Sequence, residues 1–126
     1  MNSTQPMIKG GCPTVYVTNL DTAVEFYTTS LGLKLMYKAP GQFAMIDAGE
    51  GSTIGLHPAG EHSPKPGTRG SIQLGLSVTQ PIEDVIETLR SRGVAFRGPL
   101  LDDEPVKIAF FEDPDGNDLY LCEYQH

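Results

Sequence analysis

The chain has 126 residues, of which 39% are hydrophobic and 20% charged, as is usual for a globular domain. Its 16 acidic and 9 basic residues give a formal net charge of −7, which opposes binding to nucleic acid or to an anionic membrane surface. No apolar run approaches the ~20 residues that span a bilayer, and residues 1–9 lack the apolar core of a signal peptide. We therefore expect a cytoplasmic protein in which Cys12 and Cys122 remain free thiols.

The first half of the chain predicts a strand, a helix and three further strands. Residues 14–18 are mostly β-branched or aromatic, which favours a strand. Apolar residues then recur at helical spacing from Leu20 to Leu31, and Gly32 follows at the position of a helix C-terminal glycine. A glycine-rich turn is expected at 48–51. The strands predicted after the helix are 33–37, 42–46 and 53–57.

The second half repeats this order after a linker. Residues 58–70 contain three prolines and three glycines, which excludes regular structure. A strand is predicted over 71–78, and a helix begins near Pro81 with an apolar stripe that ends before Gly93. A loop is expected at 98–105. The remaining predicted elements are strands at 94–96, 106–111 and 118–124, with a tight turn at 113–117 between the last two.

The two halves are related by a nearly constant offset. Val17 and Val78 lie 61 residues apart, and Gly51 and Gly116 lie 65 residues apart. The longer loop expected in the second half accounts for the change in offset. We therefore predict one domain built from two modules, at about 12–57 and 71–124, joined by the linker 58–70.

Alternation along the strands predicts one apolar face, packed on the helices, and a second face that is small, polar or aromatic. If the sheets curve, this second face lines a cavity. Tyrosine rings there supply stacking area, and their hydroxyl groups orient polar atoms, so a small, partly aromatic or planar ligand is expected. The residues predicted to line the cavity are Tyr16, His57, Gln73, Ser77, Tyr120, Cys122 and Tyr124.

Three stretches carry a family resemblance: VYVTNLDTAVEFY at 15–27, LGL at 31–33 and FFEDPDGN at 110–117. Together with the paired modules, they make residues 12–124 resemble the vicinal oxygen chelate superfamily, which includes glyoxalase I, bleomycin-resistance proteins, fosfomycin-resistance enzymes and extradiol dioxygenases. The resemblance implies an α+β fold of two tandem βαβββ modules. These form a curved mixed sheet around a cavity, with the helices on the convex side. It also implies a homodimer, in some members with segments exchanged between the chains.

Metal-using members of this superfamily hold a divalent ion on four side chains, two from each module. The resemblance places the corresponding positions at Cys12, Gly55, Gln73 and Tyr120. A thiol, a missing side chain, an amide and a phenol are a poor donor set for a divalent ion, so we expect a degenerate site and no cofactor. A divalent metal at a shifted site of Cys12, His57 and Gln73 is the alternative.

Three functions follow from these observations. The first is a metal-free protein that binds a small molecule. The second is a lyase or isomerase of the glyoxalase type, which uses either the shifted metal site or His57 and Tyr120 as an acid–base pair. The third is a partner-binding module with a residual cavity. The acidic residues Glu112, Asp113 and Asp115 are expected to serve turn formation and solvation rather than catalysis.

Overall fold

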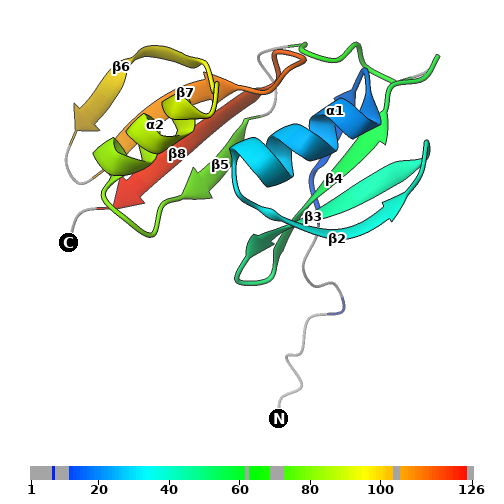
Figure 1. Ribbon diagram of the computed structural model, residues 1–126, viewed down its shortest axis with the longest axis horizontal. Helices are drawn as coiled ribbons and strands as arrows, with labels where there is room; N and C mark the ends of the chain where they lie inside the picture. Colours follow the sequence, from blue (N-terminus) through cyan, green and yellow to red (C-terminus); the bar gives the residue numbers. More distant parts are fainter. Residues whose placement is uncertain (1–6, 8–11, 62, 69–72, 104–105, 125–126) are drawn as a thin grey trace.

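The computed structural model describes residue 7 and residues 12–61, 63–68, 73–103 and 106–124. Each module has a helix that packs on a four-stranded mixed sheet (Figure 1). Module one comprises β1 (Thr14–Val17), α1 (Leu20–Glu25), the π-helical turn η1 (Phe26–Ser30), β2 (Lys34–Ala39), β3 (Phe43–Gly49) and β4 (Ser52–Pro58). Module two comprises β5 (Leu74–Ser77), α2 (Ile82–Ser91), β6 (Phe96–Asp103), β7 (Val106–Glu112) and β8 (Asp118–Tyr124).

The two sheets have the same topology. The strand orders are β1-β4-β3-β2 and β5-β8-β7-β6, so in each module the first and last strands are neighbours. These neighbours, β1 with β4 and β5 with β8, run parallel, whereas the other pairs are antiparallel. The predicted α+β fold of two tandem βαβββ modules is confirmed, and the sheets do not close into a barrel.

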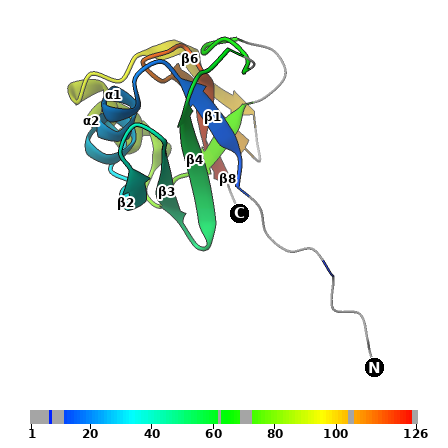
Figure 2. The ribbon, with the colours of Figure 1, turned by 90° about the vertical axis from the view of Figure 1, so that its right-hand side faces the viewer.

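Both helices lie on the same side of the molecule (Figures 1 and 2). The core lies between them and the sheets as one cluster of buried apolar side chains from both modules. Tyr27 and Phe111 are its largest fully buried members. We call the opposite side of each sheet, which carries no helix, its open face. No helix in the described part of the chain is long and apolar enough to cross a membrane.

The first helix differs from a regular α-helix. Its apolar stripe of Leu20, Ala23, Val24 and Tyr27 is buried, as the sequence predicts. The last turn widens to a π-helix, in which the backbone N–H of Leu31 donates to the carbonyl of Phe26. The helix ends before Gly32, whose φ of 79° is readily adopted by glycine.

The predicted loop at 98–105 is wrong over its described part, because β6 continues through residues 98–103. Gly98 has a φ of 71°, and the pairing register with β7 shifts between Arg97 and Leu101. The glycine–proline pair that favours a loop in the sequence therefore forms an irregularity inside a strand. Residues 104 and 105, and residues 71 and 72 of the strand predicted at 71–78, lie outside the described residues.

Candidate functional site

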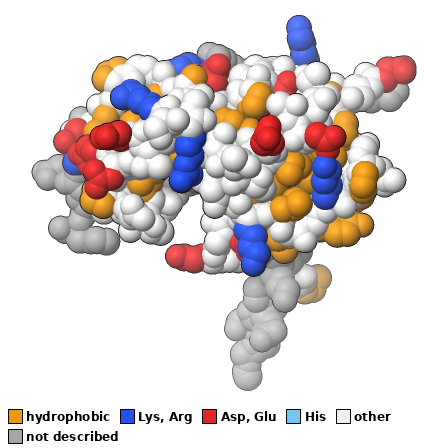
Figure 3. Space-filling view, in the orientation of Figure 1, with side chains coloured by type: hydrophobic (Ala, Val, Ile, Leu, Met, Phe, Trp, Pro, Cys, Tyr) orange, Lys and Arg blue, Asp and Glu red, His pale blue; other side chains and the backbone are white. Residues whose placement is uncertain are grey.

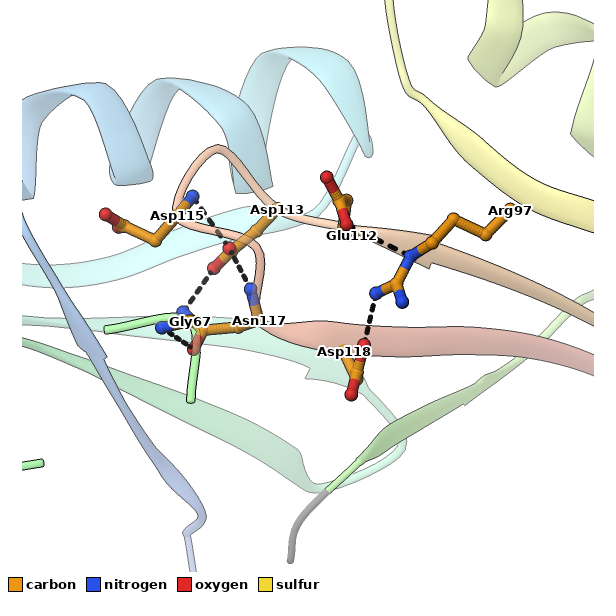
Figure 4. A network of polar contacts seen from close by, with 7 residues as sticks. All are labelled: Gly67, Arg97, Glu112, Asp113, Asp115, Asn117 and Asp118. Carbon is orange, nitrogen blue, oxygen red and sulfur yellow. Dashed lines mark hydrogen bonds and ion pairs between the residues drawn. The ribbon is translucent and has the colours of Figure 1, made fainter. Parts of the chain in front are cut away.

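The turn at residues 113–117, here called the junction turn, is built around a buried carboxylate (Figure 4). One oxygen of Asp113 accepts hydrogen bonds from the backbone N–H groups of Asp115 and Asn117, at 3.0 and 2.9 Å. The other accepts from the Asn117 amide at 2.9 Å and from the Tyr27 hydroxyl at 3.0 Å. Asp113 therefore forms the predicted turn, but it is buried rather than solvated.

Burial controls the protonation of this pair. Desolvation, followed by the adjacent charge of Asp113, raises the pKa of Tyr27 well above its ordinary value of 10.0. Desolvation also raises the pKa of Asp113, while the hydrogen bonds from Asn117, Tyr27 and Asp115 act in the opposite direction. The phenol consequently stays protonated at neutral pH and donates to the carboxyl group, which is a structural arrangement.

The junction turn holds module two against module one. The backbone N–H and the hydroxyl of Thr18 donate to the carboxylate of Asp115, at 3.1 and 2.5 Å. The Asn117 amide donates to the carbonyl of Tyr16 at 3.2 Å and accepts from the N–H of Gly67 in the linker at 2.9 Å. The turn thereby fixes the end of β1, and with it the backbone of Tyr16, one of the residues predicted to bind a ligand.

On the open face of module one, Tyr16 and His57 lie on paired strands, with their ring centroids 5.8 Å apart. The His57 ring is exposed, and its Nδ1 lies 2.8 Å from the carbonyl oxygen of Pro58. Gly55 lies on the same face, where Thr14 and Cys12 crowd it. A Cβ atom on Gly55 would lie 3.2 Å from Thr14 Oγ1 and 3.4 Å from Cys12 Sγ.

On the open face of module two, the Tyr120 ring lies across Gly75 on the neighbouring strand. A Cβ on Gly75 would come within 2.5 Å of the phenol oxygen and 2.8 Å of Cε2, so only glycine leaves room for the ring in this position. The ring also contacts Phe110, at a centroid distance of 5.9 Å and an interplanar angle of 56°. Tyr120 and Phe110 are both half-buried, so they form an aromatic pair that remains accessible.

Three charged side chains gather at the end of β8 that adjoins the junction turn (Figure 4). Arg97 Nε lies 3.0 Å from a carboxylate oxygen of Glu112, oriented as an ion pair rather than as an aligned hydrogen bond. The same guanidinium donates through Nη2 to Asp118. Since Arg97 pairs with Phe110 in the sheet, this network lies beside the aromatic pair.

The seven residues predicted to line a cavity divide between the two open faces. Tyr16 and His57 belong to module one and the other five to module two, where Ser77 Oγ lies 3.8 Å from Cys122 Sγ. Gln73 is exposed, and Tyr124 is 61% exposed. Tyr16 lines a cleft of about 130 Å³ beside the linker, whereas Ser77 lines a cleft of about 580 Å³ between the modules.

The four positions at which the resemblance implies metal ligands are also divided between the two modules. Cys12 and Gly55 lie in module one, and Gln73 and Tyr120 lie in module two. Gly55 supplies no donor, and the Tyr120 phenol lies over Gly75. This donor set does not fit a divalent ion. Within the described ranges, no three His, Cys, Asp or Glu side chains gather where they would hold a metal.

Sequence reasoning missed a groove between the modules. The cleft of about 580 Å³ runs between β5 and the β3–β4 turn, and a second cleft of about 320 Å³ lies toward the helices. We call the two together the inter-module groove, because they share lining residues. The shared residues are Ala48, Leu76, Ser77, Val78 and Thr79. The sequence feature that could have indicated the groove is Ala48, a small residue that corresponds to Asp113 in the internal repeat.

Comparison with known structures supports both the fold and the family. TnmS3, an antibiotic binding protein from Streptomyces sp. CB03234, is 26% identical, with a TM-score of 0.79 over 96% of this chain and 100% of that one. A glyoxalase/bleomycin resistance protein/dioxygenase superfamily member from Sphaerobacter thermophilus DSM 20745 is 25% identical, with a TM-score of 0.77 over 93% and 98% of the two chains.

Lactoylglutathione lyase from Agrobacterium tumefaciens has the same fold, at 18% identity and a TM-score of 0.73 over 94% of this chain and 96% of that one. No curated protein matches the sequence. The sequence model of the glyoxalase/bleomycin resistance protein/dioxygenase superfamily matches residues 11–121, which is most of the chain. The chain therefore belongs to the glyoxalase/bleomycin resistance protein/dioxygenase superfamily.

Proposed function

We propose that this protein binds a small, partly aromatic or planar molecule without the help of a metal ion. The observation that carries the proposal is the chemistry of the four inherited ligand positions. Cys12, Gly55, Gln73 and Tyr120 offer too few strong donors for a divalent cation. What the open face of module two offers instead is the aromatic pair of Tyr120 and Phe110, with Arg97 beside it.

The aromatic pair suits a planar ligand for a physical reason. Half-buried rings provide apolar area at low entropic cost, and aromatic contacts contribute about 0.5–1.5 kcal/mol beyond that area. Because Gly75 has no side chain, the Tyr120 ring lies across β5, where it forms an apolar surface together with Phe110. The similarity to an antibiotic binding protein supports the same function.

Isothermal titration against a panel of small molecules tests this proposal, with planar antibiotics and non-planar antibiotics of similar size as the two arms. We expect at least one planar compound to bind the wild type, and Tyr120→Ala to weaken its binding by about tenfold. Gln42→Ala, an exposed change in the turn before β3, is the matched control and is expected to bind normally. Failure of every compound to bind would refute the proposal.

Metal analysis separates this function from a glyoxalase-type lyase or isomerase. Protein purified without chelators is expected to carry well under one equivalent of metal, and nickel, zinc or manganese is not expected to raise its melting temperature. For the metal-free version of the enzyme, the His57→Ala variant is the test. Turnover of a 2-oxoaldehyde-derived substrate that disappears in this variant would favour catalysis by His57 over simple binding.

We also propose that the protein forms a homodimer. The edge strand β2 exposes three consecutive apolar side chains, Leu35, Met36 and Tyr37, at 39%, 56% and 55%. Hydrophobic side chains also gather on the module-one half of the helix-bearing side (Figure 3). An exposed apolar strand edge is a common site of self-association. Light scattering after size-exclusion chromatography is expected to give twice the mass of one chain, and Met36→Lys is expected to lower it.

A further inference from the structure

The contact between the modules has two halves. Each residue of one half has a counterpart in the other half through the internal repeat. In the first half, the junction turn of module two contacts module one through Asp113, which binds Tyr27 in η1, and through Asp115, which binds Thr18 just after β1. In the second half, residues 48–52 of module one, which comprise the end of β3, the β3–β4 turn and the first residue of β4, face β5 and α2 of module two. The offset of 65 residues pairs Ala48 with Asp113, so the second turn has a methyl group where the first has a buried carboxylate.

The residue that corresponds to Tyr27 is Leu89, at an offset of 62 rather than 61, because the π-helical turn η1 contains one residue more than the end of α2. In each module, the residue after the helix-ending glycine donates its N–H to a helix carbonyl. Leu33 donates to Tyr27 at 3.0 Å, and Val94 donates to Leu89 at 3.0 Å. The phenol–carboxylate pair of the first half is therefore replaced by the side chains of a leucine and an alanine, which line the same cleft. A smaller and wholly apolar pair leaves the second half of the contact unfilled.

The unfilled space is the inter-module groove. Its helix-side cleft of about 320 Å³ is lined by half-buried apolar side chains, including Leu31, Leu76 and Val85, which pack on the core. Hydroxyl groups of Ser77, Thr79 and Thr88 supply polar atoms along the same cleft. Arg92, also in the lining, already donates to the carbonyl of Ser30 at 3.2 Å.

We propose that the inter-module groove is a binding site for an uncharged molecule, which inserts an aryl ring where the first half of the contact holds the Tyr27 ring. The protein itself supplies the template, because Tyr27 is fully buried in the matching position. The apolar lining around Ala48 and Leu89 favours an uncharged ring, since a charge placed there would lose its hydration. This site is separate from the open-face site of the proposed function and does not depend on it.

The probe for this site is 4-methylphenol, the side-chain analogue of tyrosine, titrated into protein labelled with carbon-13 at its methyl groups. We expect the resonances of Leu76, Val78 and Leu89 to shift in a saturable manner. Ala48→Leu, which fills the groove with an apolar side chain, is expected to weaken binding by about tenfold. Ala59→Leu adds the same atoms at an exposed position outside the groove and is expected to leave binding unchanged.

A second pair of variants rebuilds the missing contact. Ala48→Asp alone places a carboxylate in apolar surroundings, and Leu89→Tyr alone places a hydroxyl group there without its acceptor, so each is expected to lower the melting temperature. Together they restore the phenol–carboxylate pair of the other half. The melting temperature of the double variant is therefore expected to lie above the value obtained by adding the shifts of the two single variants. The double variant is also expected to lose 4-methylphenol binding.

Three results would overturn the inference. The first is that the wild type does not bind 4-methylphenol, or that Ala48→Leu binds it as tightly as the wild type. The second is that the shifts centre on Ile108, which shares the open face of module two with Phe110. The third is that the groove resonances shift with protein concentration alone, which would make the groove a contact between copies of the chain. The second result would assign the ligand to the open face and so support the proposed function, and the other two leave the panel test of the open face unaffected, so the two proposals fail separately.

Discussion

The two turns that connect the last strands of each module have the same place in the repeat but different environments. The junction turn at 113–117 lies in the contact between the modules, where Asp113 is 3% exposed and accepts four hydrogen bonds. At the turn 48–52, which borders a groove, one bond of this kind is found among the described residues: the N–H of Gly49 donates to Asp47, just before the turn on β3. Asp113, which binds Tyr27, thus belongs to a closed contact, whereas Ala48, which lines the same cleft as Leu89, belongs to an open one.

A second difference concerns the glycines of the open faces. In module one, Gly55 lies on β4 and is crowded by Thr14 from β1, whereas in module two Gly75 lies on β5 and is covered by Tyr120 from β8. The glycine and the covering side chain have exchanged strands between the modules. Since the covering side chain is small in one case and aromatic in the other, the ring that lies over a glycine belongs to module two. The open faces of the two modules therefore differ in their side chains although the topology of the sheets is the same.

The largest expected effect comes from removing the carboxylate of the junction turn. Asp113→Ala leaves the Tyr27 hydroxyl and the Asn117 amide without their acceptor in a buried site, and we expect it to lower the free energy of unfolding by about 3 kcal/mol. Urea denaturation followed by circular dichroism measures this loss. Asp47→Ala, just before the other turn, removes one exposed hydrogen bond and is expected to cost less than about 1 kcal/mol. Equal losses would remove the distinction between the turns.

The glycine comparison predicts a smaller effect. Gly75→Ala places a methyl group inside the volume of the Tyr120 ring and forces the ring to move, at an expected cost of about 2 kcal/mol. Gly55→Ala meets its nearest neighbours at 3.2 and 3.4 Å, so we expect less than half that cost. In the background of Tyr120→Ala, the cost of Gly75→Ala is expected to fall close to zero. If denaturation shows the same cost with and without the ring, the Tyr120 ring does not depend on Gly75.

The sequence predicted most of the strands because alternation and turn residues are local signals. It also identified the 113–117 turn from its Asp-Pro-Asp-Gly-Asn composition. It did not predict the burial of Asp113, because the hydroxyl that binds this carboxylate lies 86 residues earlier, at Tyr27. The strand at 98–103 was missed because Gly98 and Pro99 favour a loop locally, while pairing with β7 is a tertiary effect.

The candidate site, like the fold, was predicted only in part. Alternation placed Tyr120 on the face opposite Leu119 and Leu121, and both leucines are buried in the core. The position of the ring over Gly75 depends on the side-chain conformation and on the neighbouring strand, neither of which alternation specifies. The inter-module groove was not predicted, because a groove arises where side chains are too small to meet. Missing side-chain volume is recognised only when the two modules are compared position by position.

Alkaline pH gives a test of the Tyr27–Asp113 pair. At neutral pH, Tyr27→Phe removes one hydrogen bond, with an expected loss of about 1.5 kcal/mol. Because the pKa of Tyr27 is raised in the folded protein, only the unfolded chain ionises as the pH rises above 10.0. Stability therefore falls in that range by up to about 1.4 kcal/mol per pH unit. The Tyr27→Phe variant lacks this contribution, whereas Tyr124→Phe, at an exposed position, is expected to retain it.

The smallest effects concern the starts of the two helices. Asn19 caps α1 locally, since its side chain accepts from the N–H of Thr22 at 2.9 Å. The start of α2 has no side-chain cap from Pro81, and Glu123 on β8 accepts from the N–H of Ile82 at 3.2 Å instead. We expect Asn19→Ala to cost about 1 kcal/mol, as is usual for the loss of an N-cap. Glu123→Gln keeps an acceptor and loses only a charge near the helix N-terminus, so its expected cost is about 0.5 kcal/mol and is reduced by salt. The salt dependence distinguishes the two helix starts, because a neutral amide cap at Asn19 is insensitive to screening.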